Sequence, residues 1–164
     1  MKNQVCCFTV HRIMKMPKSE IIKRLDEVID YLVSKGVIYY GCGGALGFDT
    51  LAAEAVIRAR NKNPNVKLIL VLPCKDQDKK WNDKDKEVYS YIKSQADKIR
   101  YISDEYTSTC MHDRNRHMVN ESSVCIAFLE RNSGGTYYTF KYAREKELVI
   151  YNLSCDDYML PTKE

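Results

Sequence analysis

The stretch Tyr40-Gly41-Cys42-Gly43-Gly44-Ala45-Leu46-Gly47-Phe48-Asp49 decides the fold of this 164-residue chain. It follows a β-branched and aromatic run and precedes a helical pattern of Leu51, Ala52, Ala55 and Val56. This order predicts a strand, a glycine-rich turn and a helix N-terminus. Glycines let backbone N–H groups approach a phosphate closely, and the unpaired amides of a first helical turn carry partial positive charge. The stretch therefore predicts an anion site, although a purely structural turn needs the same glycines.

Apolar runs and helical patterns alternate along the rest of the chain. The runs are apolar along their length, as expected for parallel strands that are covered on both faces. The alternation predicts an α/β fold with a mainly parallel sheet. We expect one domain over residues 1–153 and a frayed C-terminal tail over residues 154–164. The predicted strands are 5–10, 37–40, 66–72, 99–102, 124–129 and 148–151, and the predicted helices are 17–35, 51–60, 88–96, 110–122 and 138–143.

The charge of the chain is close to balanced. Lysine and arginine number 26 and aspartate and glutamate 22, for a net charge of +4. The positive charges are interleaved with acids rather than gathered in a run, which argues against a nucleic-acid partner. No signal peptide follows Met1, and no apolar stretch reaches the length of a membrane span. We expect a reduced, cytoplasmic protein without membrane contact.

The sequence predicts neither a metal nor a cofactor. No Cys-x-x-Cys or His-x-x-x-His pair has the spacing of zinc ligands, which favours buried, inert thiols. There is no Walker-type Gly-Lys-Ser/Thr motif, and no local Ser-His-Asp or Cys-His arrangement. The residues weighed as metal ligands are Cys6, Cys7, Cys42, Cys74, Cys110, His11 and His112.

Polar and glycine residues follow four of the predicted strands, including a second glycine turn after the fifth. In an open parallel sheet, ligands bind beyond the C-terminal strand ends, where the strand order reverses. We therefore expect a phosphate-bearing ligand at this edge. The residues are Thr9, His11 and Arg12, then Gly41, Gly43, Gly44 and Gly47, then Lys75, Asp78 and Trp81, and finally Ser133, Gly134, Gly135 and Thr136.

Four side chains near this edge have two interpretations each. Asp49 would repel a phosphate on the helix amides, so it either accepts hydrogen bonds from sugar hydroxyls or complements the helix dipole. Arg114 and His112 either counter phosphate charge or form a solvated helix face. Trp81 lies in a segment of alternating lysine and aspartate, which is either a solvated loop entering a helix or a loop whose tryptophan stacks on a base or covers the site.

Five segments together resemble the YpsA-like branch of the SLOG superfamily, over roughly Val5 to Leu153. The resemblance implies a Rossmann-like three-layer sandwich and a bacterial, cytoplasmic protein that binds a nucleotide or a nucleotide-derived molecule, in some cases as a ligand sensor. The branch usually has Thr-Gly-His-Arg after the first strand, where this chain has Thr9-Val10-His11-Arg12. The segments are Cys6 to Arg12, Gly43 to Asp49, Leu70 to Lys75, Cys110 to Arg116 and Ser133 to Thr136.

Two relatives of that branch suggest alternatives. LOG phosphoribohydrolases cleave the N-glycosidic bond of nucleoside monophosphates with an arginine, matched here by Arg114, and a glutamate, replaced here by Thr139. Hydrolysis would then need Asp49 or Glu54 as the carboxylate. The Gly44 to Asp49 segment is also similar to a DprA pattern, which implies DNA binding. We predict a binding protein first, a hydrolase second and a DNA-binding protein third, and a homo-oligomer stays open.

Overall fold

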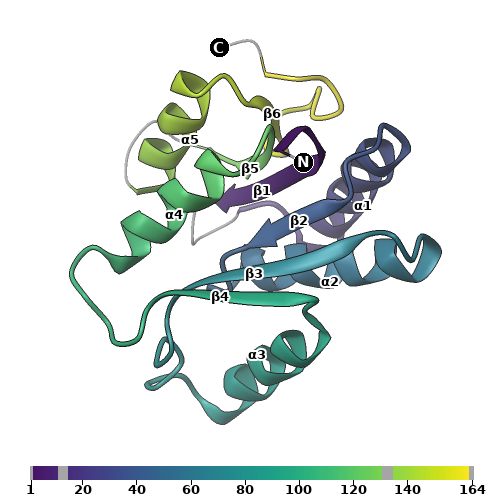
Figure 1. Cartoon of the computed structure of the whole chain (residues 1–164). Helices are drawn as coiled ribbons and strands as arrows, with labels where there is room; N and C mark the ends of the chain where they lie inside the picture. The colour runs from purple at the N-terminus through teal and green to yellow at the C-terminus, as the bar shows by residue number, and fades with distance from the viewer. Residues whose placement is uncertain (1, 11–14, 131–134, 163–164) are drawn as a thin grey trace.

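Six parallel strands form the central sheet of the computed structural model, which describes residues 2–10, 15–130 and 135–162 and, within them, all side chains except those of residues 10, 135 and 136. Their order is β4-β3-β2-β1-β5-β6 (Figure 1). Every neighbouring pair is parallel, which confirms the α/β prediction. The strands are β1 (Val5–Val10), β2 (Tyr39–Cys42), β3 (Lys67–Cys74), β4 (Lys98–Ser103), β5 (Val124–Phe128) and β6 (Val149–Asn152).

Five α-helices cover the two faces of this sheet. Buried residues of α1, α2 and α3 pack on one face, and those of α4 and α5 pack on the other. The result is the three-layer sandwich that the family resemblance implies. A short 3₁₀ turn, Lys2–Gln4, precedes the first strand. The helices are α1 (Lys18–Ser34), α2 (Phe48–Lys62), α3 (Asp83–Gln95), α4 (Cys110–Asn120) and α5 (Gly135–Glu145).

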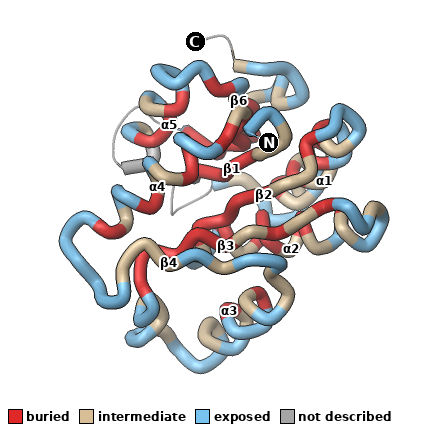
Figure 2. Tube along the Cα trace, in the orientation of Figure 1, coloured by how far each residue is buried: buried red, intermediate tan, exposed pale blue. Residues whose placement is uncertain are grey.

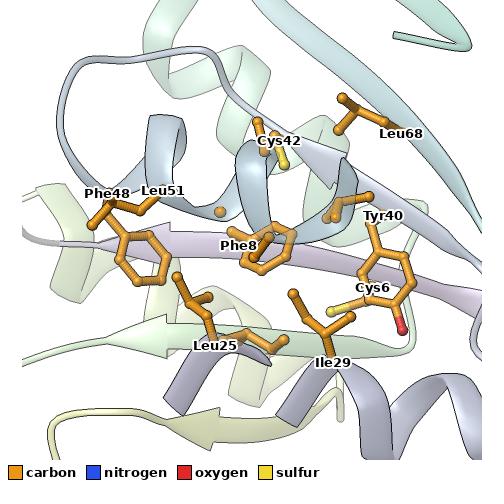
Figure 3. Packing of buried hydrophobic residues seen from close by; sticks show 14 of the residues in the cluster. Cys6, Phe8, Leu25, Ile29, Tyr40, Cys42, Phe48, Leu51 and Leu68 are labelled. Atoms are coloured by element: carbon orange, nitrogen blue, oxygen red, sulfur yellow. The ribbon is translucent and has the colours of Figure 1, made fainter. Parts of the chain in front are cut away.

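Alternate residues of β1 serve the two layers. Phe8 packs toward α1 and α2, with its ring centroid 6.3 Å from those of Tyr40 and Phe48 (Figure 3). Cys7, one residue earlier, belongs to the core under α4 and α5. This alternation is why a continuous apolar run predicts a strand that is covered on both faces. Burial accordingly concentrates on the strands in Figure 2, whereas residues 104–109 are exposed.

The strand order reverses at β1. The chain runs from β1 through β2 and β3 to β4 at one edge, and β5 and β6 then extend the sheet from the other side of β1. The C-terminal ends of β1 and β5 therefore flank the reversal point, where ligands of such folds bind. The segments after these ends contain the predicted ligand residues His11, Arg12, Ser133 and Gly134, which lie outside the described residues.

Most element boundaries differ from the sequence-based expectation by one to five residues, and two of the differences have a clear physical reason. Strand β2 extends to Cys42, because Gly41 and Cys42 pair with Ile69 and Leu70 of β3. Helix α3 begins at Asp83, where the Asn82 side chain accepts a hydrogen bond from the Asp85 amide at 2.8 Å. The alternating charges of that segment hide this N-cap in the sequence.

The segment predicted as a frayed C-terminal tail contacts α1 within the described residues. Arg24 of α1 donates hydrogen bonds to the carbonyls of Leu153 and Cys155, at 2.8 and 2.9 Å. Its guanidinium also lies 4.5 Å from the ring centre of Tyr158, whose hydroxyl donates to Glu27. These contacts are long-range, so local sequence gives no sign of them.

Candidate functional site

The glycine turn between β2 and α2 needs two left-handed residues. Gly44 has φ of +73° and Gly47, the N-cap of α2, has φ of +88°. Only glycine adopts such angles without steric cost. The turn therefore brings the chain from the end of β2 sharply into the first turn of α2.

Two buried charges hold the inner side of this turn. Arg114, on α4, donates from Nη1 to the carbonyl oxygen of Gly43. Asp49, in the first turn of α2, accepts a hydrogen bond from the Ala45 amide at 3.0 Å. Arg114 is 5% exposed and Asp49 7%, so both are oriented toward the protein interior. A neighbouring side chain also fixes the guanidinium, because Arg114 Nε donates to Asn115 Oδ1 at 2.8 Å.

The two charges affect each other's ionisation. Burial raises the pKa of the Asp49 carboxyl, while Arg114 and the Ala45 amide act to lower it. Burial lowers the pKa of the Arg114 guanidinium, and the Asp49 carboxylate opposes that change. Each charge thus reduces the cost of burying the other.

The glycines at the start of the turn leave no room for a side chain. A Cβ on Gly43 would lie 2.6 Å from Arg114 Nη1 and 3.0 Å from Asp49 Oδ2. A Cβ on Gly44 would lie 2.4 Å from Leu72 Cδ2. These two glycines therefore have a packing role whether or not a ligand binds.

A cavity of about 740 Å³ opens on the outer side of the turn, and we call it the turn cavity. Two exposed lysines, Lys79 and Lys80, contribute positive charge, and Asp76 contributes one negative charge. The exposed side chains of Leu46 and Tyr106 supply apolar surface. The lining residues are Ala45, Leu46, Gly47, Pro73, Cys74, Asp76, Gln77, Lys79, Lys80, Trp81, Tyr106 and Met111.

Gln77 connects this cavity to the glycine turn. Its side-chain nitrogen donates to the Gly44 carbonyl and contacts the Tyr89 hydroxyl, each at 3.2 Å. Reversing the amide would point its oxygen at the Gly44 carbonyl, so the orientation is determined by that acceptor. In the described part of the chain, Oε1 of Gln77 is a buried acceptor without a hydrogen-bond partner.

Trp81 forms part of the wall between two cavities. Its ring meets Tyr89 edge-on, with centroids 5.0 Å apart, and it lines both the turn cavity and a neighbouring cavity of about 630 Å³. Asp49 and Glu54 line that neighbouring cavity, which is bordered by α1, α2 and α3. Trp81 thus borders the site as well as packing on its neighbour, so both of its interpretations stay open.

Three predicted ligand residues point elsewhere. Lys75 pairs with Asp104 at 3.2 Å and is absent from the lining of both cavities. His112 lies on the outer side of α4, where with Thr139 it lines a separate groove of about 280 Å³. Thr9 is buried at the end of β1, opposite Ala127 of β5.

The turn itself is the part of the predicted site that the structure brings together. Gly43, Gly44, Gly47, Asp49 and Arg114 form one unit, with Trp81 beside it. Residues Gly135 and Thr136 begin α5, and their side chains are outside the description.

Several residues of the site were missed from the sequence. Gln77, Lys79 and Lys80 lie in the lysine- and aspartate-rich segment, which is typical of a solvated loop. Asn115 follows Arg114 directly and gave no separate signal. The burial of Arg114 could have been predicted from the sequence. Cys110, Arg114 and Met118 recur at a spacing of four on α4, and all three are buried.

All seven cysteines are free, and six of them are buried. In residues 2–10, 15–130 and 135–162, no group of three or more potential metal ligands occurs. No helix in these ranges is both long and apolar enough to cross a membrane.

A solved structure has the same fold. The structure of DNA processing protein A from Helicobacter pylori, whose title describes a single-stranded DNA binding mode, matches with a TM-score of 0.65 at 19% identity. The match covers 91% of this chain and 64% of that one. This chain therefore spans less than two thirds of that protein, and the likeness concerns the fold.

Sequence relatives include proteins of Bacillus species. The uncharacterized SPbeta prophage-derived protein YoqJ of Bacillus subtilis is 30% identical over 149 residues, covering 82% of this chain and 87% of YoqJ. A UPF0398 protein of Bacillus pumilus is 28% identical over 144 residues, covering 85% and 75%. The family model described as YspA SLOG family (YpsA) matches residues 9–157, in agreement with the motifs of the glycine turn and of α4. The chain belongs to the YpsA family of SLOG proteins.

Proposed function

We propose that this chain is a cytoplasmic binding protein and that its turn cavity binds a nucleotide or a nucleotide-derived small molecule. One observation carries the proposal: a glycine turn is held from behind by two buried charges, and its outer side borders a lysine-containing cavity. Burying the charges of Arg114 and Asp49 behind this turn carries a desolvation penalty. A binding function on the outer side of the turn explains why the chain contains these buried charges.

In this proposal the phosphate meets the outer side of the turn. The N-terminus of α2, whose N-cap Gly47 lines the turn cavity, provides partial positive charge there, and Lys79 and Lys80 add full charges. Arg114 favours an anion from behind the turn and keeps the turn in shape, rather than contacting solvent. The second predicted phosphate contact, at Ser133 and Gly134, lies outside the described residues and stays a prediction from the sequence.

The rest of the ligand has apolar and polar partners in the same cavity. Trp81 and Tyr106 offer aromatic surface for a base. The unpartnered Oε1 of Gln77 suits a ligand that carries an N–H or O–H donor, after a small side-chain movement. Asp49 lines the neighbouring cavity and not the turn cavity, so its predicted contact with a sugar would place the sugar in the neighbouring cavity.

The hydrolase alternative has less support. Arg114 is bonded to Gly43, whereas Thr139, at the position of the hydrolases' glutamate, lines the groove on the far side of α4. The carboxylates that line the neighbouring cavity are Asp49, Glu54 and Asp85. Release of a free base is therefore a measurement that the binding experiment includes.

Binding of single-stranded DNA is the second candidate function. It is favoured by the solved structure of the same fold, whose title names single-stranded DNA binding. The sequence-based argument against nucleic acid rested on the distribution of charge along the chain. Charges that are interleaved in sequence can still gather on one surface, so that argument loses force.

Thermal unfolding against AMP, ADP, NAD, ADP-ribose and cyclic dinucleotides tests the leading proposal. A ligand at about one hundred times its dissociation constant adds about 2.7 kcal/mol of stability. We expect a shift that is lost in Lys79→Ala/Lys80→Ala. Lys75→Ala is the matched control, since Lys75 pairs with Asp104 outside the cavity.

The glycine variants are less suitable probes, because a side chain at Gly44 would collide with Leu72 and disturb the fold itself. A shift without base release, sensitive to the lysine pair, supports the binding protein. Base release would favour the hydrolase, and no shift with any compound would refute the proposed site.

A further inference from the structure

A second polar surface lies on the outer side of α4, away from the glycine turn. His112 and Arg116 stand four residues apart on α4 and face α5, which contributes Lys141. Glu145 is the one acid in the lining of this α4–α5 groove. The surface is therefore locally basic, although the sequence around it is mixed.

Aromatic rings accompany these cations. Tyr138 is 69% exposed, and Tyr142 lies beside it on α5. Arg116 sits over the ring of Tyr142, 4.4 Å from its centre, and the Tyr142 hydroxyl donates to Asn120 Oδ1 at 2.6 Å. This stacking positions the guanidinium before any ligand arrives.

The size of the groove favours contact with part of a polymer. Its volume is about 280 Å³, which is below the roughly 300–1,000 Å³ of sites that enclose a small molecule. A cavity of this size suits one base or one phosphate at a time. Exposed aromatics with neighbouring cations are the combination by which proteins hold unpaired nucleic-acid strands.

We propose that the α4–α5 groove binds single-stranded nucleic acid, with a base stacked on Tyr138 and backbone phosphates against Arg116 and Lys141. This inference names the surface for the second candidate function, and it is independent of the turn cavity. A duplex fits less well, because its bases are already stacked and cannot cover the tyrosine ring.

Fluorescence anisotropy with labelled oligo(dT) and oligo(U) of about 12 nucleotides tests this, since such lengths are in the range of single-strand sites. We expect Arg116→Ala/Lys141→Ala to weaken binding at least tenfold. In this variant the slope of log affinity against log salt concentration should become shallower by roughly 1.4, because each contacted phosphate of a single strand contributes about 0.7 to the slope. Equal binding of oligo(dT) and oligo(U) indicates that the groove recognises bases and phosphates without distinguishing DNA from RNA. A preference for one oligomer identifies DNA or RNA as the natural ligand.

Two further variants separate stacking from folding. Tyr138→Ala should weaken binding, and Tyr138→Phe should restore it, since a phenyl ring stacks as well. Lys23→Ala/Lys62→Ala removes two positive charges from α1 and α2, on the opposite face of the sheet, and should leave binding unchanged.

Three outcomes would overturn the inference. The first is that Lys79→Ala/Lys80→Ala loses binding while Arg116→Ala/Lys141→Ala binds as the wild type does. This result would place the nucleic acid in the turn cavity and preserve the second candidate function. If the wild type binds neither oligomer, both the groove and the second candidate function are refuted. A change of sedimentation coefficient in Tyr138→Ala would identify the groove as an interface between copies of the chain. None of these outcomes affects the thermal shifts with nucleotides.

Discussion

The two sides of α4 carry the same kinds of residue in opposite environments. Arg114 is buried, bonded to Gly43 and near the charge of Asp49. Arg116, two residues later, is exposed and stacks on Tyr142. One guanidinium holds a turn in place, and the other is displayed to solvent.

The motif Met111-His112-Asp113-Arg114-Asn115-Arg116 is therefore not one site. A helix places residues two apart on different sides, so a motif of adjacent polar residues divides between two surfaces. The inner side belongs to the fold of the turn cavity, and the outer side belongs to the α4–α5 groove. The comparison can be tested on each side.

The largest expected difference is in stability between Arg114→Ala and Arg116→Ala. Arg114→Ala leaves the buried Asp49 without its counter-charge and should cost about 3–5 kcal/mol. Arg116→Ala removes an exposed cation–π contact and should cost less than about 1 kcal/mol. Urea unfolding measures both, and equal losses would refute the distinction between the two sides.

The next difference concerns glycines on the inner side. Gly43→Ala places a methyl group against Arg114 and Asp49, and overpacking of this kind costs about 1–3 kcal/mol. Gly41→Ala is the matched control, since its Cβ would lie at an ordinary 3.8 Å from the Cys6 carbonyl. Denaturant unfolding of the two variants should separate them, and a more stable Gly43→Ala protein would contradict the packing described for Arg114.

A smaller effect should follow pH. Burial raises the folded-state pKa of Asp49 above its ordinary 3.8, so at pH values between the unfolded-state and folded-state pKa the folded state holds a proton that the unfolded state has released. Stability from this residue is full below about pH 4 and is lost as pH rises through the folded-state pKa, by at most about 1.4 kcal/mol per pH unit.

Comparison with Asp49→Asn isolates this contribution, because other carboxylates titrate equally in both proteins. The wild type should lose stability relative to Asp49→Asn as the pH is raised from about 4. A wild type that gains stability relative to the variant over that range would show that Arg114 and the Ala45 amide outweigh burial.

The smallest expected effect is that of Gln77→Met. The variant loses the bond to Gly44 and the Tyr89 contact, yet it also removes the unpartnered Oε1. The lost bonds and the removed unpartnered oxygen have opposite effects of about 1 kcal/mol each, so the free energy of unfolding should change by less than about 1 kcal/mol. Nucleotide affinity, measured by calorimetry, should nevertheless fall. Unchanged affinity would remove Gln77 from the proposed site.

The sequence predicted the sheet well and the site in part. Alternating apolar runs and helical patterns identify all six strands. Strands that are covered on both faces appear as continuous apolar runs, whereas amphipathic helices show apolar residues at helical spacing. The glycines of the β2–α2 turn were identified by their conformational freedom. Gly44 and Gly47 indeed have positive φ.

The remainder depends on contacts between distant segments. The spacing of Cys110, Arg114 and Met118 indicates an inward face, but that Arg114 meets Gly43 requires the sheet order. The packing of Arg24 on Tyr158 and the pairing of α4 with α5 likewise join remote parts of the chain. Local periodicity carries no information about such neighbours.

Nuclear magnetic resonance of the 19.1 kDa protein, with amide shifts followed during titration with ADP, locates a bound nucleotide directly. Binding in the turn cavity predicts that the largest shifts occur at Leu46, Gly47, Lys80 and Trp81. Shifts confined to Arg116, Tyr138 and Lys141, or no shifts with ADP, AMP and NAD, would contradict it.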